Sequence, residues 1–108
     1  MNKYHNIKTE IDGITFASKA EARRYQELKL MERAGVIGEL ELQPSFALVV
    51  NGTKICRYVA DFKYLDKEKS TNAEDCRVVE DVKGVKTPAY RLKKKLMKAI
   101  HGIEVQEI

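Results

Sequence analysis

Two apolar segments that contain acidic residues decide the fold of this chain: YVADF at residues 58–62 and VEDVK at residues 79–83. Both lie in longer runs rich in β-branched and aromatic residues, which predict strands over residues 54–64 and 76–83. A chain of 108 residues has room for one modest core. Residues 1–108 are therefore expected to form a single domain around these strands.

The second segment sets acidic and basic side chains next to each other. Because residues two apart share a face of a strand, Asp81 and Lys83 are expected side by side, with Glu80 on the opposite face. Asp61, Asp81 and Lys83 together suit a Mg²⁺-dependent phosphodiester hydrolase. In such an enzyme the carboxylates hold the cation, and the cation and the lysine stabilise the negative charge that develops at phosphorus. The carbonyl of Val82 could supply a further oxygen ligand. The alternative is that Asp61 and Asp81 form ordinary surface ion pairs, which contribute little to stability.

A third carboxylate, Glu21, lies near the start of an expected helix over residues 19–34. Ser18 and Glu21 have the spacing of a capping box, in which Glu21 caps the helix N-terminus. Glu21 also precedes Tyr25 and Leu28 by four and seven positions. It therefore lies at the rim of the inward stripe, within reach of a metal at the sheet edge. The two roles are compatible, because a cap uses only one carboxylate oxygen.

Turn and capping signals divide the rest of the chain. The pattern is β-hairpin, helix, three or four strands, helix and short strand, which predicts a mixed α/β fold with a helix before and after the main strands. The further expected elements are hairpin strands at 6–11 and 14–17 around Asp12-Gly13, strands at 37–42 and 46–50 separated by Gln43-Pro44, a helix at 88–101 between Thr87 and Gly102, and a strand at 103–107. Gln43 either satisfies backbone groups at a bulge or orients the attacking water or a phosphate.

The charge of the chain is unevenly distributed. Residues 82–103 contain seven of the 20 basic residues and none of the 16 acidic ones, which favours a polyanionic partner. On the second helix, Tyr90, Lys94 and Lys98 recur at i, i+4 and i+8 beside Arg91, where they could bind phosphates. The alternative is a plain amphipathic helix with a solvated lysine face and a core stripe of Ala89, Leu92, Leu96, Ala99 and Ile100.

Compartment and membrane signals are simple. No apolar run approaches the roughly 18 residues of a membrane span, and no signal peptide is recognisable, so no membrane partner is expected. Cys56 and Cys76 lack the spacing of a metal site and are expected to be reduced, buried thiols. The predicted location is the cytoplasm.

These elements together resemble the PD-(D/E)XK nuclease superfamily. Its signature is a helical Glu, an Asp on a central strand, and a (D/E)-x-K motif on the next strand followed by a helix. The likeness extends over residues 16–101 and lies in the phrases FASKAE (16–21), QP (43–44), YVADF (58–62) and EDVKG (80–84). In detail, the chain is similar to small phage-encoded members that resemble Holliday junction resolvases. It departs from the signature at Ala60, where proline is usual, and at Asp81, where Glu is more frequent.

The resemblance implies a restriction-endonuclease-like core of about four mixed strands flanked by helices, with Mg²⁺ or Mn²⁺ as cofactor. It implies a catalytic set of Glu21, Asp61, Asp81 and Lys83. Asp61, Asp81 and the carbonyl of Val82 would bind the metal, with Glu21 completing the shell directly or through a water, and Lys83 would position or activate water. The substrate-binding residues would be Gln43, Tyr90, Arg91, Lys94 and Lys98.

The function expected from these signals is metal-dependent endonuclease cleavage of branched or otherwise structured DNA, in phage recombination or replication inside a bacterial host. A homodimer is expected, because cutting two strands symmetrically needs two sites. Two alternatives remain open. One is a non-catalytic nucleic-acid-binding module on the same fold, and the other is an interaction subunit of a larger phage DNA-processing complex.

Overall fold

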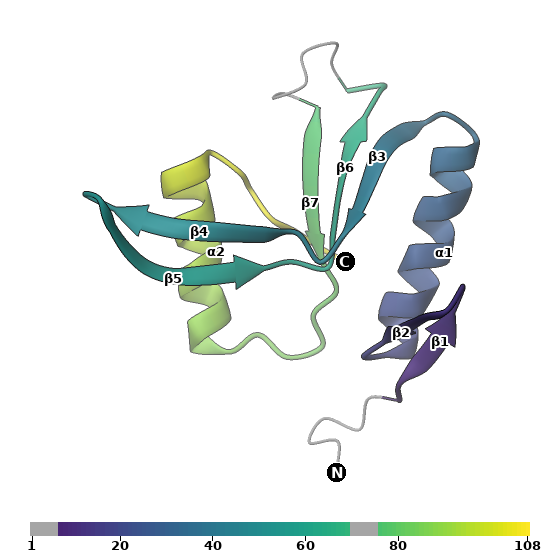
Figure 1. The fold of residues 1–108 in the computed structure, drawn as a ribbon, viewed down its shortest axis with the longest axis horizontal. Helices are drawn as coiled ribbons and strands as arrows, with labels where there is room; N and C mark the ends of the chain where they lie inside the picture. Colours follow the sequence, from purple (N-terminus) through teal and green to yellow (C-terminus); the bar gives the residue numbers. More distant parts are fainter. Residues whose placement is uncertain (1–6, 70–75) are drawn as a thin grey trace.

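A four-stranded mixed sheet lies at the centre of the protein, as the computed structural model of residues 7–69 and 76–108 shows (Figure 1). Its strands are β3 (Ile37–Leu42), β6 (Phe62–Asp66), β7 (Arg77–Asp81) and β8 (Gln106–Glu107), in that spatial order. The first three pair antiparallel, and β8 pairs parallel to β7. The other elements are the hairpins β1 (Thr9–Ile11)–β2 (Ile14–Phe16) and β4 (Ser45–Val50)–β5 (Thr53–Val59), and the helices α1 (Lys19–Arg33) and α2 (Pro88–His101). The predicted mixed sheet with flanking helices and an N-terminal hairpin is confirmed.

Both helices begin and end at the residues that the capping signals indicated. The side chains of Ser18 and Thr87 each accept a hydrogen bond, 3.1 Å long, from the backbone N–H three residues later. Gly35 follows α1 with a φ of +80°, and Gly102 follows α2 with a φ of +68°. These left-handed conformations favour glycine and stop a helix. The ends of the helices were therefore predictable from local chemistry alone.

The chain bends sharply where one uninterrupted strand over residues 54–64 was expected, and that expectation is wrong. β5 ends before Ala60, and β6 begins after Asp61. The bend coincides with a second break at Gln43-Pro44: the Gln43 N–H donates to the carbonyl of Asp61 (2.9 Å), and the Ala60 N–H donates to that of Pro44 (3.0 Å). Gln43 has a φ of +51°, and proline has no N–H to continue a ladder. The hairpin β4–β5 therefore runs in a different direction from the sheet (Figure 1).

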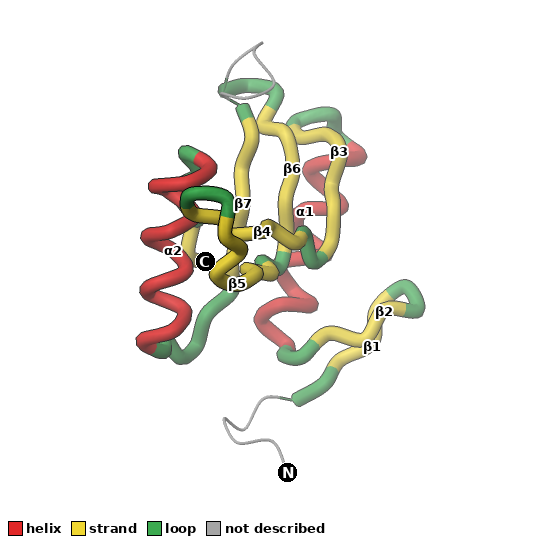
Figure 2. The backbone as a smooth tube through the Cα atoms, turned by 60° about the vertical axis from the view of Figure 1, so that its left-hand side comes forward, coloured by secondary structure: helices red, strands yellow, loops and turns green. Residues whose placement is uncertain are grey.

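The two helices lie on different sides of the central strands and cover two separate apolar clusters (Figure 2). The bend distributes residues between these clusters. Tyr58 and Ala60 belong to the cluster of α2, and Phe62 and Tyr64 belong to that of α1. One uninterrupted strand would instead have placed all four side chains on the same face. The buried members are Leu48, Tyr58, Ala60, Val79, Tyr90, Met97, Ile103 and Val105 on the α2 side, and Phe16, Ala22, Tyr25, Leu28, Ile37, Phe62 and Tyr64 on the α1 side.

Helix α2 presents a different face to the core than its apolar pattern indicated. Tyr90 and Met97 are buried, whereas Leu92 is 58 % exposed. Of the expected stripe, Leu96 and Ile100 are partly buried, but Ala89 and Ala99 are exposed. The face is set by contacts with β4, which include the pair formed by the His101 ring and the carbonyl of Ala47 (2.8 Å). Sequence periodicity contains no information about this contact.

A few further expectations concern single segments. The strand predicted at 76–83 ends at Asp81, and that predicted at 103–107 is limited to Gln106–Glu107. Cys76 is buried as expected, but Cys56 is only partly buried. Residue 6 of the expected hairpin lies outside the described residues, and so do residues 70–75 between the strands expected at 54–64 and 76–83. Of the helices in the described part of the chain, none is both long and apolar enough to cross a membrane.

Candidate active site

Asp81 lies at the end of β7, and its carboxylate is enclosed by the protein. Its residue surface is 1 % exposed. The hydroxyl of Tyr58 donates a hydrogen bond to Oδ2, and Lys83 Nζ lies 3.5 Å from Oδ1. Oδ1 is buried and has no hydrogen-bond partner among the described residues. The structure thus places Asp81 beside Lys83 as expected, although the strand ends before Lys83.

Asp61 occupies the bend between β5 and β6, where it faces the end of β7. Its Oδ2 accepts a hydrogen bond of 2.7 Å from the backbone N–H of Val82. Burial is the main cause that raises the pKa of Asp61 to about 8; a hydrogen bond with Asp81 and charge repulsion from it act in the same direction, and the Val82 N–H opposes the shift. The two aspartates are therefore close enough to compete for negative charge.

Glu21 comes to the same place from the first turn of α1. It is 8 % exposed, and burial is the main cause that raises its pKa, against a backbone hydrogen bond from Ala17 that lowers it. The charge of Asp81 raises the same pKa and that of Lys83 lowers it. Glu21 therefore belongs electrostatically to the group formed by Asp61, Asp81 and Lys83.

An open cleft of about 460 Å³ gives solvent access to this group. Asp81 lies beneath its surface, whereas Glu21, Asp61 and Lys83 border it directly. The remaining lining comes from Ala17, Ser18, Val82, Gly84, Val85, Thr87 and Tyr90. A second hollow of about 260 Å³ shares Glu21 and Asp61 and includes the exposed Gln43. The four predicted catalytic side chains thus converge from three separate parts of the chain.

Glu80 points to the other side of the sheet, as its alternation with Asp81 indicated. Arg24 holds it through two hydrogen bonds, Nε to Oε1 at 2.8 Å and a terminal guanidinium nitrogen to Oε2 at 2.6 Å. The hydroxyl of Tyr64 donates to the same Oε2. Glu80 is 1 % exposed and has a complete set of partners. It therefore supports the fold and does not belong to the cleft.

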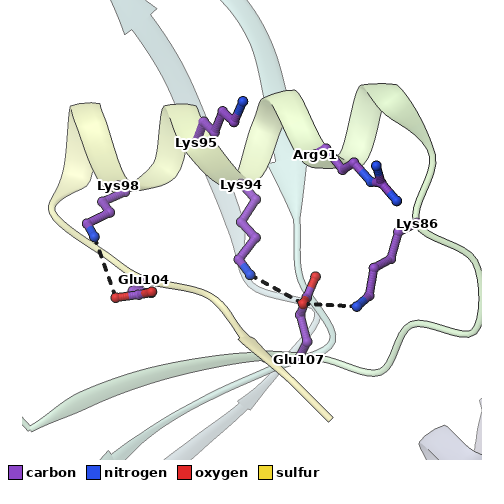
Figure 3. Close-up of a pocket in the computed structure, with 7 residues that line it drawn as sticks. All are labelled: Lys86, Arg91, Lys94, Lys95, Lys98, Glu104 and Glu107. Carbon is purple, nitrogen blue, oxygen red and sulfur yellow. Dashed lines mark ion pairs between the residues drawn. The ribbon is translucent and has the colours of Figure 1, made fainter.

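The predicted substrate-binding residues of α2 fall into two environments. Tyr90 is 6 % exposed and packs in the core, so the expectation that it lies on an open face with Lys94 and Lys98 is wrong for its ring. Its ring centroid lies 4.9 Å from Lys83 Nζ, close enough for a cation–π contact. Arg91, Lys94 and Lys98 instead line a basic groove of about 480 Å³ along the outer side of α2 (Figure 3).

Three residues that contact or line these sites were not identified from the sequence. Tyr58 reads as a core aromatic residue, although its hydroxyl contacts Asp81. Lys86 and Glu107 also line the basic groove, and they are 21 positions apart in sequence. The basic window did include Lys86, so charge patterning could have found it. No local signal connects Glu107 with α2.

The donor groups can be tested against Mg²⁺, the cation that the resemblance implies. Within residues 7–69 and 76–108, no group of three or more His, Cys, Asp or Glu side chains forms a ready-made metal site. Mg²⁺ does not require one, because it keeps several waters and is commonly bound by one or two carboxylates together with substrate phosphates. Asp81 Oδ1 is a buried oxygen that accepts no hydrogen bond and has only the ion pair with Lys83, and Asp61 borders the cleft beside it. These oxygens fit a hydrated Mg²⁺ ion that is shared with a substrate.

Comparison with known protein families gives one finding. Residues 1–106 match the family described as "Protein of unknown function (DUF1064)". A search of curated proteins finds no significant match, and a search of solved structures finds none either.

Proposed function

Because the chain belongs to the DUF1064 family, whose description assigns no activity, we propose its function from the site: a Mg²⁺- or Mn²⁺-dependent DNA endonuclease of the PD-(D/E)XK type. One observation carries the proposal. Asp61 and Lys83 border an open cleft with Asp81 buried beside them, and Oδ1 of Asp81 accepts no hydrogen bond and has only the ion pair with Lys83 at 3.5 Å. An unsatisfied buried carboxylate oxygen is costly, and a bound cation would offset that cost.

The proposed roles follow from position. Asp61, Asp81 and the carbonyl of Val82 would hold the cation, and Glu21 would support it directly or through a water. A bound Mg²⁺ supplies Lewis-acid stabilisation of phosphate oxygens and lowers the pKa of a water ligand. Lys83 contacts Asp81 at 3.5 Å and borders the cleft. Its ammonium group can therefore orient a water and stabilise the negative charge that develops on the phosphate.

The proposed reaction is hydrolysis of a DNA phosphodiester. A water oxygen attacks phosphorus in line, a new P–O bond forms, and the bond between phosphorus and the 3′ oxygen breaks. The attacking water releases a proton to solvent, the leaving 3′ oxygen takes one up, and the products are a 5′ phosphate and a 3′ hydroxyl. In the metal-free protein Asp61 holds a proton near neutral pH, since burial and Asp81 raise its pKa to about 8, and a cation held by Asp61 would displace that proton.

The proposed substrate is branched or otherwise structured DNA, as in Holliday junction resolution. The basic groove beside the cleft supports a polyanionic partner. A domain of this size offers little surface for reading bases, so backbone shape is the more suitable signal. We further propose a homodimer, because symmetric cleavage of two strands needs two sites.

The proposal is tested by incubating the protein with a synthetic four-way junction and with a linear duplex, with Mg²⁺, with Mn²⁺ and with EDTA. We expect metal-dependent cleavage of the junction. The variants Asp61→Ala, Asp81→Ala and Lys83→Ala should each lose cleavage but keep DNA binding. Lys63→Ala on β6 is the matched control, since Lys63 does not line the cleft, and it should cut normally. Cleavage that survives the three substitutions would exclude this site.

A non-catalytic nucleic-acid-binding module is the second candidate, and two observations favour it. The described residues contain no ready-made three-ligand metal site, and Asp81 already has a hydrogen bond from Tyr58 and an ion pair with Lys83. Isothermal titration calorimetry with Mg²⁺ separates the two candidates. The nuclease requires a binding isotherm that Asp81→Ala abolishes, whereas the binding module shows DNA affinity but no Mg²⁺ binding. An interaction subunit would show no salt-dependent DNA affinity.

A further inference from the structure

Three donors surround the carboxylate of Glu107, and two of them, Lys86 and Lys94, are drawn in Figure 3. The Tyr90 hydroxyl donates a hydrogen bond of 2.8 Å to Oε2. Lys86 Nζ and Lys94 Nζ each lie 3.3 Å from Oε1. The donors come from the loop before α2 and from two successive turns of the helix. Three converging donors around one oxyanion form a site that a phosphate could occupy equally well.

The neighbouring residues repeat this arrangement along the helix. Glu104 Oε2 lies 3.6 Å from Lys98 Nζ, and Lys98 follows Lys94 by one turn, or about 6 Å along the axis. The segment 104–107 thus sets two carboxylates against two lysines that lie on successive turns of α2. Arg91 and Lys95 also line the groove, and neither has a carboxylate partner among the residues drawn in Figure 3.

We infer that Lys86, Tyr90 and Lys94 form a binding site for a backbone phosphate of DNA, and that Glu107 occupies this site until the DNA displaces it. The inference rests on the proposed function for the identity of the polyanion. It adds Lys86 to the binding residues and gives the carboxylate of Glu107 the role of an intramolecular competitor. Glu107 is accessible to solvent, with a side chain that is 26 % exposed, so an incoming phosphate can reach the donors.

The position of Tyr90 connects this site to the cleft. Tyr90 lines the cleft that contains Asp61, its ring contacts the ammonium group of Lys83, and its hydroxyl reaches the groove on the other side. A phosphate bound at the Glu107 position would therefore lie on the path of a strand whose scissile phosphate enters the cleft. This placement gives the hydroxyl of a core aromatic residue a role in the groove, through its bond to Glu107.

The inference is tested by DNA binding without cleavage. Binding of a fluorescein-labelled four-way junction is followed by anisotropy in EDTA over a series of salt concentrations. Glu107→Gln should raise the affinity at low salt by about threefold or more and steepen the slope of log K against log salt by about 0.9, the value for one further phosphate contact. Glu104→Gln is the matched control, because it removes the same charge from the same groove without touching the three donors, and its effect should be smaller.

Two further variants keep the test decisive if Glu107→Gln folds poorly. Lys86→Gln and Tyr90→Phe should each weaken binding in the wild-type background, and Lys86→Gln should cancel the gain of Glu107→Gln in the double variant. Equal effects of Glu107→Gln and Glu104→Gln, or no effect of Lys86→Gln, would overturn the phosphate site. The nuclease proposal can fail separately. If the variants bind DNA in this pattern but the protein never cuts it, the phosphate site is supported and the nuclease proposal is refuted. Absence of salt-dependent binding in every variant would refute both.

Discussion

The hydroxyl of Tyr58 donates a hydrogen bond to Oδ2 of Asp81, although Tyr58 belongs to hairpin β4–β5 and Asp81 to the central sheet. The contact exists because the chain bends at Ala60-Asp61, which lets β5 turn toward the side of the sheet that Asp81 faces. Burial and the charge of Asp81 raise the pKa of Tyr58, so its hydroxyl remains a donor over the accessible pH range. The bend therefore positions Asp61 directly and Asp81 through Tyr58.

Replacing Tyr58 by Phe should destabilise the metal-free protein. The change leaves the buried Asp81 carboxylate without its hydroxyl donor, a loss that costs about 1–3 kcal/mol for a buried polar group. Urea denaturation followed by circular dichroism measures the free energy of unfolding. Tyr90→Phe is the control, because it removes a hydroxyl that bonds the partly exposed Glu107, and its loss should be below about 1 kcal/mol. Equal losses for the two variants would contradict the importance of the Tyr58–Asp81 bond.

Removing Arg24 should be far more damaging than its position on a helix surface suggests. Arg24→Met leaves Glu80, whose side chain is 2 % exposed, as a buried carboxylate without its cation, which costs about 3–5 kcal/mol. Glu80→Gln in the same chain should restore part of the stability, because the amide is neutral. Glu27→Gln removes the second, more exposed partner of Arg24 and should change stability by less than about 0.5 kcal/mol.

The same variants test whether Glu80 belongs to the site. Glu80 lies on the α1 side of the sheet and does not line the cleft. At a temperature where the double variant Arg24→Met, Glu80→Gln is folded, junction cleavage should therefore proceed within a fewfold of the wild-type rate. Loss of cleavage in a folded double variant would show that Glu80 takes part in the chemistry.

Two substitutions on α2 distinguish its true core face from the one that its apolar pattern indicated. Met97 is fully buried, so Met97→Ala should cost about 2–5 kcal/mol through a cavity in the core. Leu92 is 58 % exposed, so Leu92→Ala should change the free energy of unfolding by less than about 0.5 kcal/mol. Thermal and urea denaturation of the two variants, side by side, measure the difference. A larger loss of stability for Leu92→Ala than for Met97→Ala would show that the core face of α2 is the one that its apolar pattern predicted.

Local signals were sufficient wherever the structure depends on neighbouring residues. The hairpin at Asp12-Gly13, the caps at Ser18 and Thr87, and the stop at Gly102 follow from turn and capping chemistry that acts over three or four residues. The alternation of β7 also placed Asp81 and Glu80 correctly on opposite faces. These elements could be predicted because no distant contact competes with them.

Distant contacts account for what could not be predicted. The bend at Ala60-Asp61 depends on hydrogen bonds with Gln43 and Pro44, and a single sequence shows no reason for the two breaks to coincide. Glu80 forms its hydrogen bonds with Arg24, which lies 56 positions away in the sequence, so the structural role of Glu80 could not be predicted from local patterns. The apolar pattern of the chain predicts amphipathic elements, but packing between elements decides which side chains they bury.

The pH dependence of stability provides a test of the aspartate pair itself. Burial and Asp81 raise the pKa of Asp61 from its ordinary value of 3.8 to about 8 in the folded protein. Between these values the folded state keeps a proton that the unfolded chain has released. The free energy of unfolding of the metal-free protein should therefore fall as the pH rises from about 4 to about 8. The slope is at most about 1.4 kcal/mol per pH unit, and it is smaller where solvent screens the half-buried carboxyl.

Asp61→Asn isolates this effect, because the amide does not titrate and all other groups stay in place. Urea denaturation in EDTA at several pH values between 4.5 and 8.5 should give a shallower decline for the variant than for the wild type. Part of the decline should remain, since burial also raises the pKa of Glu21. Mg²⁺ should flatten the wild-type profile as well, because a cation bound to Asp61 displaces the proton. Parallel profiles for the two proteins in EDTA would show that Asp61 carries no shifted proton. A wild-type profile that Mg²⁺ leaves unchanged would count against metal binding at this pair.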